Sequence, residues 1–481
     1  MFEHILTFAA RIDALLWGPW TMAFIAATAI YFTLRSRFFQ VRRFGFILKR
    51  TAGTALKKRP GARAGRLTPF QAVSTALAST VGMGNMAGVA TALSLGGPGA
   101  VFWMWVLAFL GMMTKTAEIT LAVHYRDAGT AGGDAGGDGR VRGGPMHYIR
   151  KGLGWGFLAK AFSVGVVVNA LFTATLLQSH TVGRAFLGSY GLNPYVTTAA
   201  IAAITGVVIL GGIRRIGRFC ERLVPAMSLV YIAAGLVVFF LNSGKAPAVF
   251  ALIVTHAFSP VPAAAGIAGH SVAAALKYGM ARGMLSNEAG LGTAPMAHAT
   301  ADTPHPFQQG MWGAFEVFVD TIVICTISAF AILSTGVLDG GRTGIDLLLA
   351  AFRTSLPAGV ASAVVSFAIL TFCLTTQIGF YIYFETAASH IFGRGAMRWL
   401  RWVYLVPGVV FAGFADVDRL WAFANIAVGA CALPNLVAVL ALSGVFFALM
   451  KDYLEGRNAY ATEITDRTRE YIRTAKSRRA T

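Results

Sequence analysis

Three glycines and an asparagine interrupt an apolar segment of the chain at Ser79–Gly88. Gly82, Gly84 and Gly88 allow the backbone to leave helical geometry, and Asn85 adds a polar side chain between them. A broken helix presents N–H groups that attract anions and carbonyl oxygens that coordinate cations. Within lipid, such a break is tolerated only where it is packed in protein or lines a cavity. The stretch therefore predicts a binding site for a solute, an ion or both.

A second interruption of this kind, Asn-Glu-Ala-Gly-Leu-Gly, lies at residues 287–292. Its Glu288 is an ionisable residue inside an apolar segment, a placement that is costly and functional by default. Three roles for Glu288 remain open. It could be an ion ligand, a substrate partner, or a structural clamp that accepts hydrogen bonds from N–H groups left exposed by the break.

Other polar residues in apolar segments have simpler interpretations. Lys115 and Glu118 stand three residues apart, which predicts a mutual ion pair on one helix face with a structural or gating role. For His298, Glu316 and Asp320, structural hydrogen bonds compete with a role as proton or gate residues.

Composition sets the class of protein that must position these residues. The chain has 481 residues, of which 56% are hydrophobic and 13% charged, and its mean hydropathy is +0.62. Soluble proteins carry about 25% charged residues, and the apolar runs here reach about 20 residues, the length of a membrane span. Buried strands of a soluble α/β protein would be runs of only about 4–8 residues. We therefore predict an all-α polytopic membrane protein.

The net charge of +20 does not indicate nucleic-acid binding, because the basic residues cluster between apolar segments. That distribution is typical of cytoplasmic loops, with anionic lipid as a secondary contact. The four cysteines show neither metal-site nor disulfide spacing. We find no nucleophile with a base and no set of metal ligands, so we predict no enzyme and no cofactor.

The hydropathy pattern predicts about eleven spans in one transmembrane domain, residues 1–481. They lie near residues 14–34, 68–95, 100–125, 155–188, 194–211, 222–242, 269–302, 308–336, 358–392, 399–414 and 419–451, the last interrupted near Pro434. Residues 248–268, which contain Pro260 and Pro262, are expected to lie on the surface or re-enter. An odd number of crossings places the N-terminus outside and the basic tail, 452–481, in the cytoplasm.

The two interrupted spans are five apart and must run in opposite directions. Interrupted helices at matching positions of two halves indicate an inverted-repeat transporter. The first repeat would be residues 68–242 and the second, inverted repeat residues 269–451. The segment 14–34 would be an extra, peripheral first span of this five-plus-five arrangement.

Three motifs resemble the alanine or glycine:cation symporter family (sodium:alanine symporters). They are Gly84–Ala90 with its continuation Gly96–Trp105, then Gly143–Met146, and then Ser286–His298. The resemblance covers residues 10–455. It implies a symporter of a bacterial or archaeal-type cell (inner) membrane that carries a small neutral amino acid with sodium, in the five-plus-five transporter fold. Its partners would be that amino acid, the sodium ion and membrane lipid.

A zwitterionic amino acid needs donors for its carboxylate and acceptors for its ammonium group. We assign the carboxylate to the backbone of Gly82, Met83 and Gly84, with Thr80 and Asn85 nearby. Carbonyls of the second break, at Asn287 and Gly290, would hold the ammonium group. The alternative for the glycines is close helix packing.

One further substrate contact rests on the resemblance, and the sodium ligands rest on oxygen chemistry. The family typically has a glutamine at Gln178, which we carry over as a substrate contact, although an interhelical packing bond is the alternative. Sodium takes hard oxygen ligands, which the hydroxyls of Thr375 and Thr376 and the carbonyl of Phe372 offer. By analogy with the fold, the carbonyls of Ala78 and Val81 complete five neutral oxygens. The alternative for the threonines is bonding to their own helix.

Two positions, and the stretch Tyr381–Phe384, depart from the family pattern. His180 stands where asparagine is expected, and Phe380 stands where tryptophan is more frequent. Alanine or glycine is therefore the first expectation, and another neutral amino acid remains open. A proton-coupled symporter with Glu288 or Glu118 as carrier is the alternative mechanism, and a channel or sensor without coupling is a third.

Overall fold

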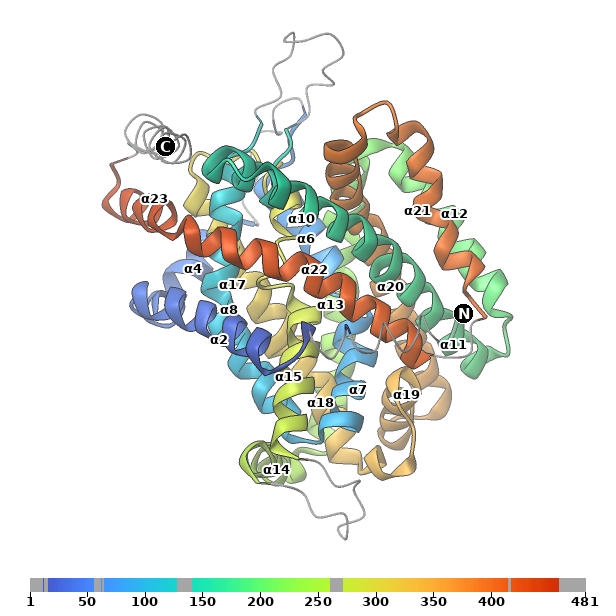
Figure 1. Cartoon of the computed structure of the whole chain (residues 1–481). Coiled ribbons are helices and arrows are strands. Elements are labelled where there is room, and N and C mark those ends of the chain that lie inside the picture. The colour runs from blue at the N-terminus through green and yellow to red at the C-terminus, as the bar shows by residue number, and fades with distance from the viewer. Residues whose placement is uncertain are drawn as a thin grey trace.

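The structure is a computed structural model that describes residues 16–55, 65–127, 141–259, 271–413 and 417–457, together with residues 12 and 62. Every regular element in these ranges is a helix (Figure 1). The described backbone outside helices pairs in two isolated bridges, Leu67–Ala301 and Asp127–Arg142. The predictions for the extreme N-terminus, for Pro260 and Pro262, and for the tail beyond residue 457 lie outside the described residues.

The helices that frame the centre of the molecule come from both predicted repeats, apart from α2, which belongs to the predicted peripheral span. Their bounds are α2 (Pro19–Arg35), α6 (Pro69–Thr80), η1 (Gly84–Gly88), α7 (Val89–Gly96), α8 (Gly99–His124), α10 (Gly156–Asn169), η3 (Ala170–Leu177), α11 (Gln178–Tyr190), α13 (Gly212–Leu241), α15 (Val272–Asn287), α16 (Pro295–His298), α17 (Pro306–Val317), η6 (Phe318–Cys325), α18 (Thr326–Thr335), α20 (Ala358–Phe392) and α22 (Val417–Ala441).

The other described helices connect these or pack around them. They are α3 (Phe39–Arg42), α4 (Phe44–Arg50), α5 (Ala52–Ala55), α9 (Pro145–Tyr148), η2 (Ile149–Leu153), α12 (Pro194–Leu210), η4 (Ser243–Lys245), α14 (Ala246–Phe258), η7 (Val337–Gly340), α19 (Gly344–Ser355), α21 (Met397–Val410) and α23 (Ser443–Glu455).

Six helical runs in the described residues are long and apolar enough to cross a membrane. The pair formed by α6 and the continuous helix Gly84–Gly96 adds a seventh, bent by 48° at its break. The prediction of an all-helical protein with several apolar spans is therefore confirmed, whereas the count of eleven crossings remains a prediction.

Local sequence explains where the helices of the site begin. Thr68 caps α6 by accepting a hydrogen bond from the Gln71 N–H, and the Gln71 side chain accepts in return from the Thr68 N–H. Such a capping box satisfies donors that a helix start leaves without partners. Ser271 caps α15 in the same way, through the N–H of Ala274. Both interrupted helices are thus anchored at their first turn.

The packing divides into two neighbouring groups. Helix α8 packs against α2, α15 and α17, while α6 packs against α13 and α20. The run from α10 to α11 packs against α20 and α22, and α12 lies beside α21 (Figure 1). The broken helices α6–η1–α7 and α15–α16 join these groups, because α7 and η1 pack against α15 and α6 packs against α16.

Three predicted boundaries are wrong in detail, and one helix was missed. Helix α13 begins at Gly212 rather than near residue 222, so the arginines from Arg214 lie on a helix; arginine is a good helix former. Pro434 lies inside α22, and the chain breaks instead between α22 and α23 at Leu442. The break after α15 is longer than predicted and ends in the four-residue α16. Helix α19 was not predicted, because only one of its faces is apolar and its sequence is therefore not a continuous apolar run.

Candidate functional site

The first break lies between α6 and η1. Helix α6 ends at Thr80, Val81 turns to an extended conformation with ψ of 94°, and η1 continues as a π-helix from Gly84. Gly82, Gly84 and Gly88 do not adopt positive φ. A Cβ on Gly82 would lie 2.5 Å from the Thr376 Oγ1, and one on Gly84 would lie 3.3 Å from the Ser286 Cα. These two glycines permit close approach of neighbouring helices.

The second break does need unusual backbone geometry. Glu288, Gly290 and Gly292 have φ of +55°, +96° and +76°. A glutamate in the left-handed region is strained, and such residues cluster at functional sites. The N–H of Ala289 donates to the Asn287 Oδ1 at 3.0 Å. Asn287 therefore performs the clamping that was one of the roles considered for Glu288.

The two breaks meet around a small enclosed cavity of about 20 Å³. Thr80, Met83 and Gly84 line it from the first break, and Leu285, Glu288 and Leu291 line it from the second. Gln178 and Phe380 contribute from α11 and α20. One water needs about 10–15 Å³ of such a cavity. The cavity is therefore too small for an amino acid, which can enter only when these walls move apart.

Two of the backbone N–H groups that we assigned to the substrate carboxylate donate to side chains of the protein. The Met83 N–H donates to the Gln178 Oε1 at 3.1 Å, and the Gly82 N–H donates to the Asn85 Oδ1 at 2.9 Å. Gln178, taken from the family resemblance, thus contacts the first break directly. The Asn85 side chain turns away from the cavity and donates to the Asp320 Oδ1 at 2.7 Å.

The carbonyls assigned to an ammonium group also have partners. Lys115 Nζ donates to the Asn287 carbonyl at 2.6 Å, and Asn435 Nδ2 donates to the Gly290 carbonyl at 2.8 Å. Each carbonyl oxygen has a second lone pair. The Glu288 Oε2 accepts from the Thr293 Oγ1 at 2.7 Å, and Glu288 lines the cavity.

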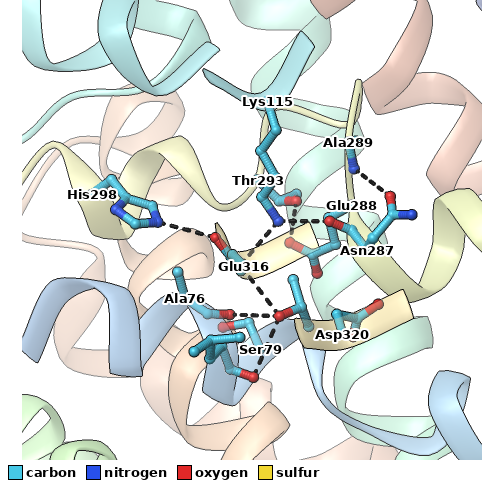
Figure 2. Close-up of polar contacts among 12 residues, drawn as sticks. Ala76, Ser79, Lys115, Asn287, Glu288, Ala289, Thr293, His298, Glu316 and Asp320 are labelled. Carbon is cyan, nitrogen blue, oxygen red and sulfur yellow. Dashed lines mark hydrogen bonds and ion pairs between the residues drawn. The ribbon is translucent and has the colours of Figure 1, made fainter. Parts of the chain in front are cut away.

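A buried ion pair supports the second break (Figure 2). Lys115 Nζ lies 2.9 Å from the Glu316 Oε1, and His298 Nε2 lies 3.1 Å from the Glu316 Oε2, all three side chains being fully buried. Thr80 Oγ1 adds a hydrogen bond of 3.2 Å to the same carboxylate. This network joins α8, α16 and α17 to both breaks.

The predicted Lys115–Glu118 ion pair is therefore wrong. Lys115 extends across to α17 and to the carbonyl end of α15, where a carboxylate and an orphan carbonyl both accept from it. Glu118 instead accepts a hydrogen bond from Asn435, which in turn accepts from the Tyr148 hydroxyl. Asn435 was not predicted, although a polar residue beside a proline in an apolar span was a usable signal.

Asp320 joins the two breaks to η6. Besides Asn85, it accepts from the Ser286 Oγ and the Thr321 Oγ1, both at 2.8 Å. Asn85 belongs to the first break and Ser286 to the last turn of α15. The Asp320 carboxylate thus accepts a hydrogen bond from each of these side chains. This agrees with the interpretation that Asp320 has a structural hydrogen-bonding role.

The oxygens expected to bind a cation are partly brought together. Thr376 Oγ1 donates to the Phe372 carbonyl at 2.9 Å and lies 3.5 Å from the Val81 carbonyl. Thr375 Oγ1 also bonds to Phe372, at 3.0 Å, but lies against the Met227 sulfur on α13. Ala78 is buried in α6, one turn before the break. Both threonines thus make the bonds to their own helix that were considered as the alternative.

Comparison with known proteins places the chain in a family. The model of the "Sodium:alanine symporter family" matches residues 2–467. The chain is 37% identical to the sodium/alanine symporter AgcS of Methanococcus maripaludis, covering 93% of this chain and 96% of that protein. It is 35% identical to the probable sodium/glutamine symporter GlnT of Bacillus subtilis, covering 95% and 92%.

Among solved structures, the manganese transporter of Eremococcus coleocola is similar with a TM-score of 0.51 and 14% identity, over 81% of this chain and 82% of that one. At that identity the likeness concerns the fold alone. The family match across nearly the whole chain is the stronger finding. The protein therefore belongs to the sodium:alanine symporter family, a family of multi-pass membrane transporters.

Proposed function

We propose that this protein is a sodium-coupled symporter that carries a small neutral amino acid, alanine or glycine first, into the cell. The observation that carries the proposal is the meeting of two helix breaks around one buried cavity. Midplane sites of inverted-repeat transporters have this construction. Family membership supports sodium coupling and an amino-acid substrate.

The proposed architecture retains the sequence predictions. Residues 68–242 and 269–451 would form two inverted repeats in one domain of eleven crossings, with 14–34 as a peripheral span. The N-terminus would lie outside, and the tail from residue 452 would be cytoplasmic. The support is that α6–η1–α7 and α15–α16, the broken elements, occupy corresponding positions in the two repeats.

Substrate binding would replace contacts that now join the breaks. The carboxylate would take the N–H groups of Gly82 and Met83, the latter released by the Gln178 carboxamide. The ammonium group would use the free lone pairs of the Asn287 and Gly290 carbonyls beside Glu288. Because the cavity is water-sized, the breaks and the helices around them would rock apart to admit substrate and close over it in turn.

Sodium would sit between α6 and α20. Its ligands would be the carbonyls of Ala78, Val81 and Phe372 and the hydroxyls of Thr375 and Thr376. One sodium ion entering down about 100 mV releases about 2.3 kcal/mol. Since about 1.4 kcal/mol is a factor of ten, a single ion supports a roughly 50-fold substrate gradient.

We expect Thr376→Val to raise the sodium concentration for half-maximal uptake about tenfold or more, because the substitution removes one well-placed sodium ligand. Thr375→Val should produce a smaller rise, because its hydroxyl lies against Met227. The matched control is Thr371→Val, on the same helix, whose hydroxyl bonds only to carbonyls of its own helix. Equal sodium dependence in all three variants would reject the site.

Purified protein in liposomes tests the proposal directly. A panel of radiolabelled neutral amino acids is offered with an inward sodium gradient, with a pH gradient, and with neither. We expect accumulation only with sodium, and accelerated exchange of labelled substrate when unlabelled substrate is present inside. Flux without such exchange would indicate a channel.

Proton coupling is the second candidate, favoured by two buried carboxylates that form no direct salt bridge with a described residue. Glu118 and Glu288 are 0% and 2% exposed, and neither forms an ion pair with another described residue. The Glu118 Oε2 has no hydrogen-bond partner within the described part of the chain.

Under the sodium proposal, Glu118→Gln should retain sodium-driven uptake, because the glutamine oxygen can still accept from Asn435. The same liposomes measure uptake driven by a pH gradient alone. The opposite result would be that the unmodified protein takes up substrate in response to the pH gradient, and that this uptake disappears in Glu118→Gln or Glu288→Gln. That result would show that protons, not sodium, are the coupling ion.

A further inference from the structure

The cavity has a third wall that neither break supplies. Asn169, the last residue of α10, and Thr173, in η3, both line it. Their side chains are buried, at 1% and 5% exposure. The Asn169 Oδ1 and the Thr173 Oγ1 have no hydrogen-bond partner among the described residues. A buried polar atom without a partner costs free energy and calls for an explanation.

The other hydroxyls of the cavity differ in this respect. Ser79 Oγ donates to the Thr75 carbonyl at 3.1 Å, and Thr80 Oγ1 donates to Ala76 and to Glu316. The unpartnered oxygens are therefore confined to the wall formed by Asn169 and Thr173. Both oxygens belong to side chains of residues that line the cavity.

A π-helical segment is what brings this wall together with Gln178. In an α-helix of about 100° per residue, Gln178 would lie about 900° beyond Asn169, on the opposite face. Residues Ala170–Leu177 are instead π-helical, and all three side chains line one cavity. Single π-helical turns occur frequently at functional sites. The change of register thus adds Asn169 and Thr173 to the face that carries Gln178.

The two breaks account for the invariant groups of an amino acid, as proposed above. The carboxylate lies at Gly82 and Met83, and the ammonium group lies beside Glu288. The wall opposite is left for the part that differs between amino acids. Leu285, Leu291, Phe380 and Val428, which also line the cavity, carry no charge.

We propose that Asn169 and Thr173 form a subsite that recognises a hydrogen-bond donor on the side chain of the substrate. The preferred substrates would be neutral amino acids with a hydroxyl or carboxamide, of which serine is the smallest. Alanine would still bind through its carboxylate and ammonium groups, but it would leave both oxygens unpaired. This inference rests on the proposed function and names the substrate class of the same site.

Serine and 2-aminobutyrate provide the test, because they have nearly the same size and differ by a hydroxyl in place of a methyl group. Sodium-driven uptake into liposomes is measured for both, and for alanine. Since a site that hydrogen-bonds a hydroxyl discriminates strongly against its absence, we expect serine to exceed 2-aminobutyrate about tenfold or more in apparent affinity.

Thr173→Val and Asn169→Leu should each reduce this ratio toward one while alanine uptake stays close to that of the unmodified protein. Thr173→Ser, which keeps the hydroxyl, should preserve the ratio. Thr198→Val is the matched control, since Thr198 is equally buried, bonds to its own helix carbonyls and lies outside the cavity.

A ratio near one in the unmodified protein would overturn the subsite. An equal loss of all three substrates in the Asn169 and Thr173 variants would also overturn it, because these residues would then bind the invariant groups or support the fold. Substrate-induced thermal shifts of the detergent-solubilised protein measure the same ratio without an ion gradient. They test the subsite even if sodium-driven uptake, and with it the proposed function, fails.

Discussion

Lys115→Met is expected to lower the free energy of unfolding by about 3–5 kcal/mol, because it leaves a buried charge without its partner. The Glu316 carboxylate would keep His298 and Thr80 but lose the ammonium group at 2.9 Å. The Asn287 carbonyl at the end of α15 would lose its donor as well. The effect is measured by thermal unfolding of the purified protein, which is monitored as the loss of its monodisperse fraction.

Two further variants separate the ion pair from a general effect of substitution. Lys451→Met removes an exposed lysine whose pair with Glu455 spans 3.9 Å, and should change little. Lys115→Met combined with Glu316→Gln should recover part of the loss, since the two residues are in contact and their effects are not additive. Unchanged stability of Lys115→Met would show that Glu316 does not need this partner.

Gly82→Ala is expected to abolish sodium-driven uptake while the protein still folds. The added Cβ would lie 2.5 Å from the Thr376 Oγ1, closer than real contacts permit, and 3.1 Å from the Gln178 Nε2, which is also tight. Either α20 must move from the first break, or Thr376 must rotate away from Val81. Both changes disrupt the proposed sodium ligands, so uptake in liposomes should fall to the background of empty vesicles.

Gly359→Ala supplies the control for this prediction. Gly359 lies on α20, the helix that carries Thr376, and a Cβ there would meet nothing within 4 Å. Alanine favours helix over glycine by about 1 kcal/mol, so uptake and stability should be retained. Normal uptake by Gly82→Ala would mean that the close contact between the first break and α20 is not needed for transport.

The two helix breaks could be predicted because closely spaced glycines beside a polar residue, and a carboxylate, are unusual inside apolar runs. Sequence could not show why the glycines are there. At Gly290 the reason is a left-handed backbone, whereas at Gly82 and Gly84 it is the approach of α20 and α15. The second kind of reason depends on a partner that is distant in the chain.

The ion pair was mispredicted for a related reason. Spacing along one helix makes Lys115 and Glu118 neighbours, but a long side chain can reach a better acceptor on another helix. Asn169 and Thr173 were missed because periodicity assumes 3.6 residues per turn, and the π-helical segment from Ala170 breaks that assumption. The resemblance to a family supplied Gln178, which periodicity would have placed on another face.

A reversible cross-link between the two breaks tests the central claim most directly. A Cβ on Gly84 would lie 3.6 Å from the Ser286 Cβ, and disulfides join Cβ atoms about 3.5–4.5 Å apart. Gly84→Cys and Ser286→Cys are combined with Cys325→Ala, because the Cys325 Sγ lies 3.2 Å from the Ser286 Oγ. Each single cysteine variant in the same background serves as control.

Sodium-driven alanine uptake is then measured before oxidation, after oxidation, and after reduction with dithiothreitol. If the substrate binds between breaks that must separate, oxidation stops uptake in the double variant and reduction restores it. Undiminished uptake by fully cross-linked protein would show that the amino acid crosses the membrane without parting these two helices.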